Sequence, residues 1–152
     1  MSNAKVVMGQ AANTLTAPVN VEDVFSTYLY AADGTSSKTI TNNIDLDGEG
    51  GLVWLKWRGG SYSHCLFDTE RGVNKQLITD WTGAESTESS SLNAFNSDGF
   101  TIGSTQNQSA FSSGVASWTF RKAPKFFDVV TWTGDGTGAR TIHIILELLS
   151  VL

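Results

Sequence analysis

Short runs of apolar and aromatic residues, each ending at Gly, Ser, Asn or Asp, dominate the chain. The main runs cover residues 52–57, 64–67, 75–78 and 116–120. Aromatic and β-branched residues favour strands, and the residues that end the runs favour turns. No segment before residue 142 shows the 3.6-residue period of an amphipathic helix. The pattern predicts an all-β chain of short antiparallel strands.

The clearest local element is a hairpin over residues 92–103. Alternating apolar positions flank Asn96-Ser97-Asp98-Gly99, where the glycine can adopt the positive φ that a tight turn requires. Two stretches rich in Ser, Thr, Asn and Gln, 83–91 and 104–113, are predicted to be loops.

An internal repeat links two distant parts of the chain. Residues 25–40 align without gaps with residues 127–142, and 6 of the 16 positions are identical, including an Asp-Gly-Thr triplet. Each copy predicts a strand, an Asp-Gly turn and a second strand, which together form a hairpin. The similarity ends abruptly at residue 143.

The repeat suggests how the chain is organised. Residues 1–24 are predicted to be an N-terminal arm or linker, residues 25–126 a β-sandwich domain, and residues 127–152 the first hairpin of a truncated second repeat with an apolar tail. A unit of about 100 residues with short antiparallel strands and long loops fits a sandwich of jelly-roll or concanavalin-A-like lectin type.

Composition excludes several classes of function. The 152 residues carry a net charge of −5, so the basic surface that nucleic acids require is missing, and nucleic acid is not an expected partner. The single cysteine cannot form an internal disulfide. Apolar runs are too short for a signal peptide or a membrane helix, so no membrane insertion is expected.

Five strings of residues carry a family resemblance that covers about residues 21–142. They are 23–30, 44–54, 66–72, 91–100 and 116–130. These strings resemble a family of virion structural proteins from marine tailed bacteriophages. The resemblance implies repeated sandwich domains similar to concanavalin-A-like lectins, in a tail fibre or another component of the virion surface.

The expected function is therefore that of a non-enzymatic phage structural protein, located in the virion after assembly in the host cytoplasm. Its expected partners are further copies of itself, as a homo-oligomer, and other virion proteins. Oligomers are expected because an unpaired second hairpin and an apolar tail would otherwise leave strand edges and apolar surface exposed. The alternative is a carbohydrate-binding, lectin-like module that recognises a glycan on the host surface.

The end of the chain departs from the family pattern. The family's usual sequence at this point can be written as a DNA sequence. When two bases are removed after the codon of Ile142, the reading frame shifts, and the new frame encodes residues 142–147 of this chain. We therefore expect residues 143–152 to be an out-of-frame tail. Alternatively, they form an apolar strand that closes the sandwich or an oligomer interface.

Asp45, Asp47 and Glu49 alternate in a glycine-rich turn and form a weak candidate for a calcium site. Calcium prefers about six to eight oxygen ligands, and the spacing does not match an EF-hand loop. The ordinary alternative is a solvated turn before a buried strand, and no cofactor is expected apart from this possible calcium ion.

The best candidate for ligand binding is Trp81, with Asp80 beside it, in a polar region with Ser, Asn and Gln nearby. Tryptophan combines a large apolar ring with a polar N–H, which suits stacking against a sugar. The alternative is a ring that anchors the loop to the sandwich.

Two other groupings have the residue types of catalysis. Asp68 and Glu70 share one face of a strand, like the carboxylates of a glycosidase, but are more simply explained as residues that orient a loop. His64 and Cys65 are adjacent, so they point to opposite faces and cannot form a nucleophile pair. No catalytic residue is therefore expected.

Overall fold

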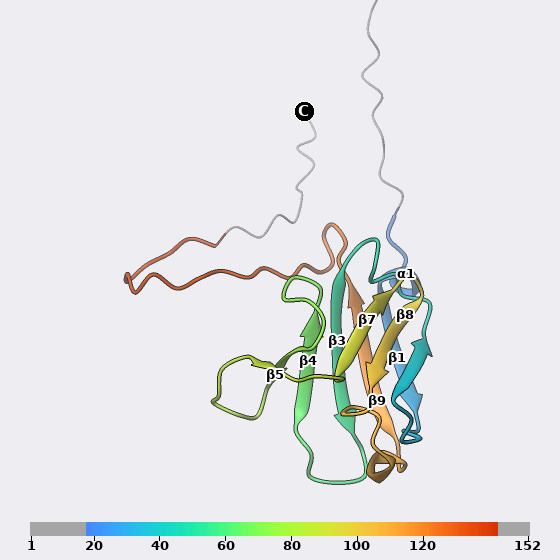
Figure 1. Cartoon of the computed structure of the whole chain (residues 1–152). Coiled ribbons are helices and arrows are strands. Elements are labelled where there is room, and N and C mark those ends of the chain that lie inside the picture. Colours follow the sequence, from blue (N-terminus) through green and yellow to red (C-terminus); the bar gives the residue numbers. More distant parts are fainter. Residues whose placement is uncertain (1–17, 143–152) are drawn as a thin grey trace, which may run out of the picture.

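The computed structural model describes residues 18–142, which form a sandwich of two antiparallel sheets (Figure 1). The larger sheet has six strands and the smaller has three. This confirms the predicted all-β antiparallel sandwich. The larger sheet runs in the order β1 (Phe25–Tyr30), β9 (Val115–Arg121), β3 (Gly51–Trp57), β4 (His64–Asp68), β5 (Lys75–Ile78) and β6 (Ser86–Thr87). The smaller runs β2 (Ser37–Thr41), β8 (Gly99–Gly103) and β7 (Leu92–Asn96).

Two short helical turns accompany the strands. The first, α1 (Val21–Val24), lies inside the region predicted as an arm, and its Val24 is buried. The second, η1 (Ser109–Phe111), interrupts the predicted loop 104–113. Residues 1–17 of the predicted arm and the predicted out-of-frame tail, 143–152, lie outside the described residues. Within the described part, no helix is long and apolar enough to cross a membrane.

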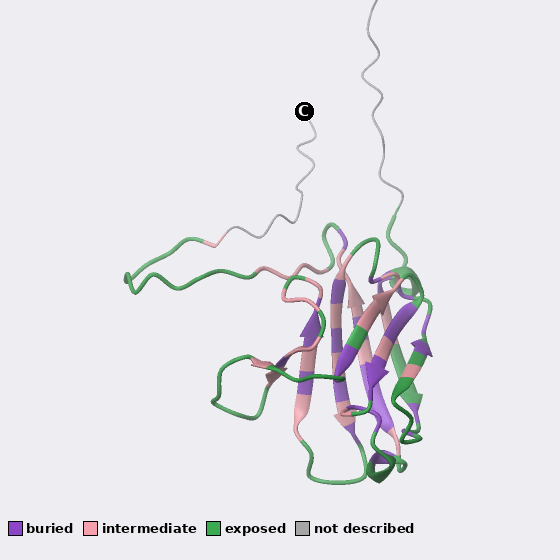
Figure 2. Cartoon of the chain, in the orientation of Figure 1, coloured by how far each residue is buried: buried purple, intermediate pink, exposed green. Residues whose placement is uncertain are grey.

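The core lies between the sheets, and the alternation along β3 shows why (Figure 2). Val53, Leu55 and Trp57 are buried, whereas the residues between them are half-buried on the outer face. Phe67 of β4 and Phe100 of β8 are fully buried in the same cluster. Removing such a side chain from water stabilises the fold by about 1.5–3 kcal/mol, so these inward positions set the register of both sheets.

Aromatic rings also cover part of the outer face of the larger sheet. The rings of Trp54 and Trp118 lie 5.2 Å apart between centroids, and Phe120 lies between Phe25 at 4.9 Å and Phe127 at 5.2 Å. Cross-strand aromatic pairs of this kind add to strand pairing. The outer face is therefore half-buried rather than polar.

The predicted hairpin over residues 92–103 is confirmed. Strands β7 and β8 pair antiparallel, with Asn96 opposite Gly99. Gly99 has a φ of +152°, and a Cβ there would lie 2.0 Å from the carbonyl oxygen of Ile40. Glycine is thus required for both its backbone conformation and the close approach of the neighbouring strand.

The hairpin predicted over residues 25–40 is wrong. Its two strands form at the expected places, but β1 pairs with β9 and β2 pairs with β8, so the segment crosses from one sheet to the other. Tight hairpins usually have a two-residue loop, whereas six residues, 31–36, separate these strands. The longer connection lets β2 bury Ile40 on the smaller sheet.

The Asp-Gly-Thr triplet shapes this connection. The Oδ1 atom of Asp33 accepts hydrogen bonds from the backbone N–H of Thr35 at 3.0 Å and from its hydroxyl at 2.6 Å. Gly34 has a φ of +78°. Lys38 forms an ion pair with Asp33 at 2.5 Å, and its hydrogen bond, together with those from Thr35 and Asn107, holds the pKa of the Asp33 carboxyl well below its usual value.

Buried Asn107 fastens this turn to the rest of the sandwich. Its side-chain amide donates to Asp33 Oδ1 at 2.6 Å and to Thr35 Oγ1 at 2.9 Å, and its backbone carbonyl accepts from the N–H of Gly34 at 2.8 Å. Its amide oxygen accepts from the backbone N–H of Asp33 at 3.2 Å. One asparagine therefore joins the connection between β1 and β2 to the loop that precedes β9.

The second copy of the repeat keeps the turn but forms no strand within residues 128–142. The carboxylate of Asp135 accepts from the N–H and hydroxyl of Thr137 at 3.0 and 2.6 Å and forms an ion pair with Arg140. Gly136 has a φ of +74°. Figure 1 shows the segment running away from the sandwich as an extended loop.

Replacing Asn107 with Ala is expected to lower the free energy of unfolding by about 1–3 kcal/mol, because the hydrogen bonds that this buried amide makes to the turn are lost. Urea denaturation followed by tryptophan fluorescence measures this change. The matched control is Asn93→Ala, at an exposed position of β7. Equal losses in the two variants would contradict the role of Asn107 as the fastening residue.

Candidate binding site

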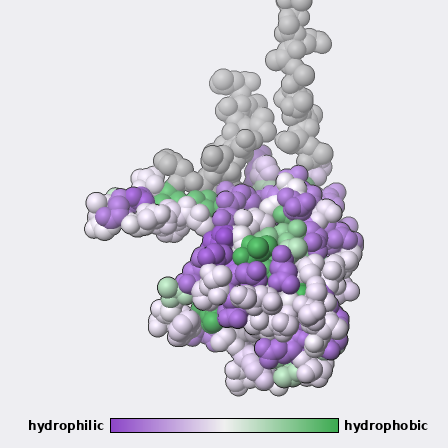
Figure 3. Space-filling model, in the orientation of Figure 1, coloured by the Kyte–Doolittle hydropathy of each residue, from purple (hydrophilic) through white to green (hydrophobic). Residues whose placement is uncertain are grey.

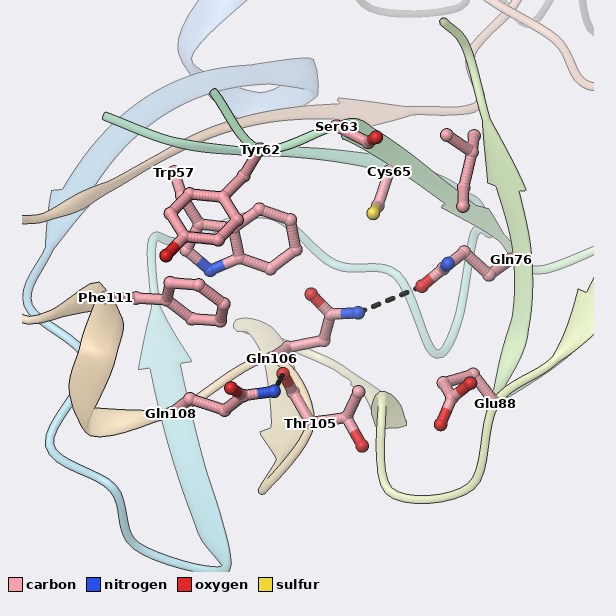
Figure 4. Close-up of a pocket in the computed structure, with 11 residues that line it drawn as sticks. Trp57, Tyr62, Ser63, Cys65, Gln76, Glu88, Thr105, Gln106, Gln108 and Phe111 are labelled. Carbon is pink, nitrogen blue, oxygen red and sulfur yellow. Dashed lines mark hydrogen bonds between the residues drawn. The ribbon is translucent and has the colours of Figure 1, made fainter. Parts of the chain in front are cut away.

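A pocket of about 350 Å³ opens where β4 and β5 extend past the smaller sheet and face the loop 104–111 (Figure 4). Its size lies within the range of small-molecule sites. The lining residues come from β3, β4, β5 and the loops between strands. They are Trp57, Tyr62, Ser63, Cys65, Gln76, Ile78, Glu88, Thr105, Gln106, Gln108 and Phe111.

One side of the pocket is aromatic. The ring centroids of Trp57 and Phe111 lie 4.5 Å apart, and Tyr62 meets Phe111 edge to face at 4.8 Å. Trp57 and Phe111 are buried, whereas Tyr62 is 42% exposed. The cluster thus joins the hydrophobic core to the pocket mouth, with Tyr62 as its accessible ring.

The other side of the pocket carries neutral amides. Gln106 donates from Nε2 to the Oε1 atom of Gln76 at 2.9 Å, and both side chains are buried. Gln108 donates to the backbone carbonyl of Thr105 at 3.1 Å. The carboxylate of Glu88 lies near these amides in Figure 4. The pocket therefore places hydrogen-bonding groups opposite aromatic rings.

Two buried polar atoms at this site have no hydrogen-bond partner within the described structure: Nε1 of Trp57 and Oε1 of Gln106. The first is a donor and the second an acceptor. Both residues line the pocket, and their side chains point toward its interior in Figure 4. Leaving a buried polar group unpaired costs about 1–3 kcal/mol, so each of these two atoms favours a further hydrogen-bond partner.

Cys65 lines the pocket and is a buried, free cysteine. Burial, with a further contribution from the charge of Asp80, raises the pKa of its thiol to about 12. His64 points to the opposite face, as predicted, where its Nδ1 accepts from Trp54 Nε1 at 2.9 Å. The two residues therefore make no catalytic pair.

Trp81 and Asp80, the ligand-binding residues predicted from the sequence, lie outside the pocket lining. Trp81 is 61% exposed, and its ring lies over Gly83, where a Cβ would come within 2.4 Å of it. Asp80 accepts a hydrogen bond from the backbone N–H of His64 at 3.3 Å. The indole is thus accessible at the surface while its neighbour supports the start of β4.

The structure does not bring the three carboxylates of the proposed calcium turn together. Asp45 accepts from the N–H of Gly48 at 2.8 Å, and Glu49 lies 3.7 Å from Arg121. Asp47 donates its backbone N–H to the carbonyl of Asn96. Over residues 18–142, no group of three His, Cys, Asp or Glu side chains is placed to hold a metal ion.

Asp68 and Glu70 are held apart by separate cations. Asp68 is buried and forms an ion pair with Arg71, whose backbone N–H it also binds at 2.9 Å. Glu70 pairs with Lys122 at 2.6 Å and raises the pKa of that lysine. Each carboxylate thus stabilises the chain around the end of β4.

Sequence reasoning missed the residues that build the pocket. Gln106 sits in a run of polar residues for which the sequence predicts only a loop, and nothing in the spacing of that run marks it as buried. Phe111 is the residue that could have indicated that this loop packs against the core, because a lone aromatic residue within a polar loop requires apolar partners.

A sequence model of a family described as a domain of unknown function, DUF7483, matches residues 20–147. The match covers the whole sandwich and continues through the second copy of the repeat. No curated protein and no solved structure matches the chain.

In the folded protein, Cys65 is expected to react with a thiol reagent such as 5,5′-dithiobis(2-nitrobenzoate) at pH 8 far more slowly than in urea. The cause is burial, which excludes the reagent and keeps the pKa of the thiol at about 12. Absorbance of the released thiolate measures both rates. A single exposed cysteine, introduced as Ser104→Cys in a Cys65→Ala background, provides the fast-reacting control, and equally fast native labelling of Cys65 would contradict this account.

Proposed function

We propose that this chain, which belongs to the DUF7483 family, has a non-enzymatic structural role at the surface of a tailed-bacteriophage virion. The module is a sandwich of jelly-roll or concanavalin-A-like type within a fibre or a related assembly. Support comes from the phage resemblance over residues 21–142 and from one structural observation, the recurrence of the Asp-Gly-Thr turn.

The two turns agree in more than sequence. In each, one carboxylate oxygen accepts from the N–H and hydroxyl of the threonine, and a cation five residues after the aspartate pairs with the other oxygen. The first turn is fastened to its own sandwich by Asn107. The second turn therefore has the same local structure as the first. In a structure built of repeats, such a turn belongs to a further sandwich unit.

The second copy also carries apolar surface that suits self-association. Trp132 is 62% exposed, and Val129 and Val130 are half-buried. On the face in Figure 3, hydrophobic residues form small separate patches within a mostly polar surface, including along this segment. A second copy of the chain is the proposed partner, because exposed apolar groups on an unpaired extended segment favour strand pairing between molecules.

The side chains with the residue types of catalysis take part in other contacts, which favours a non-enzymatic role. Asp68 and Glu70 each hold a different cation, and burial keeps the Cys65 thiol protonated. These groups serve packing and ion pairing. Binding and assembly are the roles that the arrangement favours.

Carbohydrate recognition is the second candidate function. The observations that favour it are the exposed indole of Trp81 and the pocket in which aromatic rings face neutral amides. Sugars offer apolar C–H faces for stacking and hydroxyls for hydrogen bonding, so both features suit them.

The location in the virion is tested by immunogold electron microscopy with antibodies raised against residues 25–126. We expect gold particles on the surface of phage particles that encode the chain, at a fixed position on the tail or capsid. The control is the same antibody after the specific fraction has been removed by adsorption to the purified domain. Labelling of infected-cell lysate alone, with none on purified virions, would refute the proposal.

Self-association through the second copy is tested with the variant Trp132→Ser. The chain is expected to form an oligomer at micromolar concentration, and the variant to shift toward the monomer, because it loses exposed apolar area. Light scattering after size-exclusion chromatography gives the mass. The control, Trp81→Ser, removes an equally exposed indole outside this segment. A monomeric wild-type chain would refute the oligomer.

A further inference from the structure

The donor and the acceptor that lack partners in the pocket require a particular kind of group. The indole N–H of Trp57 needs an acceptor, and the amide oxygen of Gln106 needs a donor. Their residues are only 6% and 2% exposed. A hydroxyl both donates and accepts, so a hydroxyl is able to pair with either kind of atom.

The wall beside these atoms requires an apolar face on the same ligand. Tyr62, Phe111 and Trp57 form a continuous aromatic cluster from the mouth of the pocket to its interior. A sugar ring presents C–H groups on one face and hydroxyls at its edge. It therefore meets the rings and the amides at the same time.

The charges of the lining residues further restrict the chemical class of ligand that the pocket suits. None of the eleven lining residues in the described structure is Lys or Arg, and the one carboxylate belongs to Glu88. An anionic ligand would have no positive partner there and would meet a negative charge. Neighbouring hydroxyls of a neutral sugar, in contrast, are natural donors to a carboxylate.

We infer that this pocket, with Trp57, Gln106 and Tyr62 as its principal contacts, binds one neutral saccharide unit of a glycan. The inference rests on carbohydrate recognition, the second candidate function, and places that recognition in the pocket instead of at Trp81. The sugar face lies against Tyr62, and its hydroxyls face the polar side of the pocket at Gln106 and Glu88.

The five tryptophans provide the direct test, because each gives one indole N–H signal in a ¹⁵N-labelled sample. The probes are the methyl glycosides of glucose, galactose, mannose and N-acetylglucosamine, each titrated to about 50 mM, since single sugar units bind with dissociation constants in the millimolar range. Glycerol is the control for nonspecific polyol effects. The variants Trp57→Phe and Trp81→Phe assign the two relevant signals.

We expect at least one glycoside to shift the Trp57 signal in a saturable manner and to leave the Trp81 signal in place. The variants Gln106→Leu and Tyr62→Ala should each weaken binding at least about tenfold, the effect of losing one well-formed interaction. Tyr62 is 42% exposed, so its variant disturbs the fold less than Gln106→Leu, which changes a residue that is 2% exposed. Tyr28→Ala, which removes an equally exposed tyrosine ring outside the pocket lining, is the matched control and should bind like the wild type.

The remaining outcomes each overturn the inference. They differ in whether carbohydrate recognition, the function on which the inference rests, is kept or rejected. A shift of Trp81 alone, lost in Trp81→Ala, keeps carbohydrate recognition but rejects the pocket as its site. No saturable shift of either signal with any probe, or an equal shift with glycerol, rejects both, and the pocket then holds ordinary water.

Discussion

A three-stranded sheet is too narrow to cover a six-stranded one, and this mismatch governs the molecule. The smaller sheet buries the inner faces of the central strands, where Val53, Phe67 and Phe100 meet. Beyond it, Cys65 of β4 and Gln76 of β5 would expose their side chains to water. The loop 104–111 takes over there, placing Phe111 against Trp57 and Gln106 against Gln76. Because a loop fills space less completely than a sheet, the pocket forms at this boundary.

The strands could be predicted because their residues act locally. In β3, alternating burial follows directly from the period of two, and in the turn before Gly99 the required backbone conformation is visible in the sequence. The pairing of β1 and β2 could not be predicted in the same way. Whether two strands separated by six residues pair with each other or with different sheets depends on β8 and β9, which lie far along the chain.

The candidate site was much less predictable than the fold. Trp81 attracts attention in the sequence because it is aromatic within polar surroundings, and the structure leaves it at the surface. Gln106 looks like any residue of a solvated loop, yet it is buried, since the edge of the larger sheet needs a cover. The carboxylates of Asp68 and Glu70 could be located from the sequence, and so could a local ion pair with Arg71, but the cationic partner of Glu70 could not. Arg71 is a neighbour in the chain, whereas Lys122 follows the end of β9, and β3 lies between β9 and β4 in the sheet.

The paired turns also bear on the order of folding. The bonds within residues 135–140 exist without any contact to an asparagine like Asn107, so they depend only on residues close in sequence. The equivalent turn at Asp33 is therefore able to form early, while the chain around it is still unfolded. Its fastening to Asn107 closes a loop of 74 residues, which is entropically costly and slow. Strand β1 pairs with β9, so it finds its partner only once residues 115–121 are in place, although it is among the first strands to be synthesised.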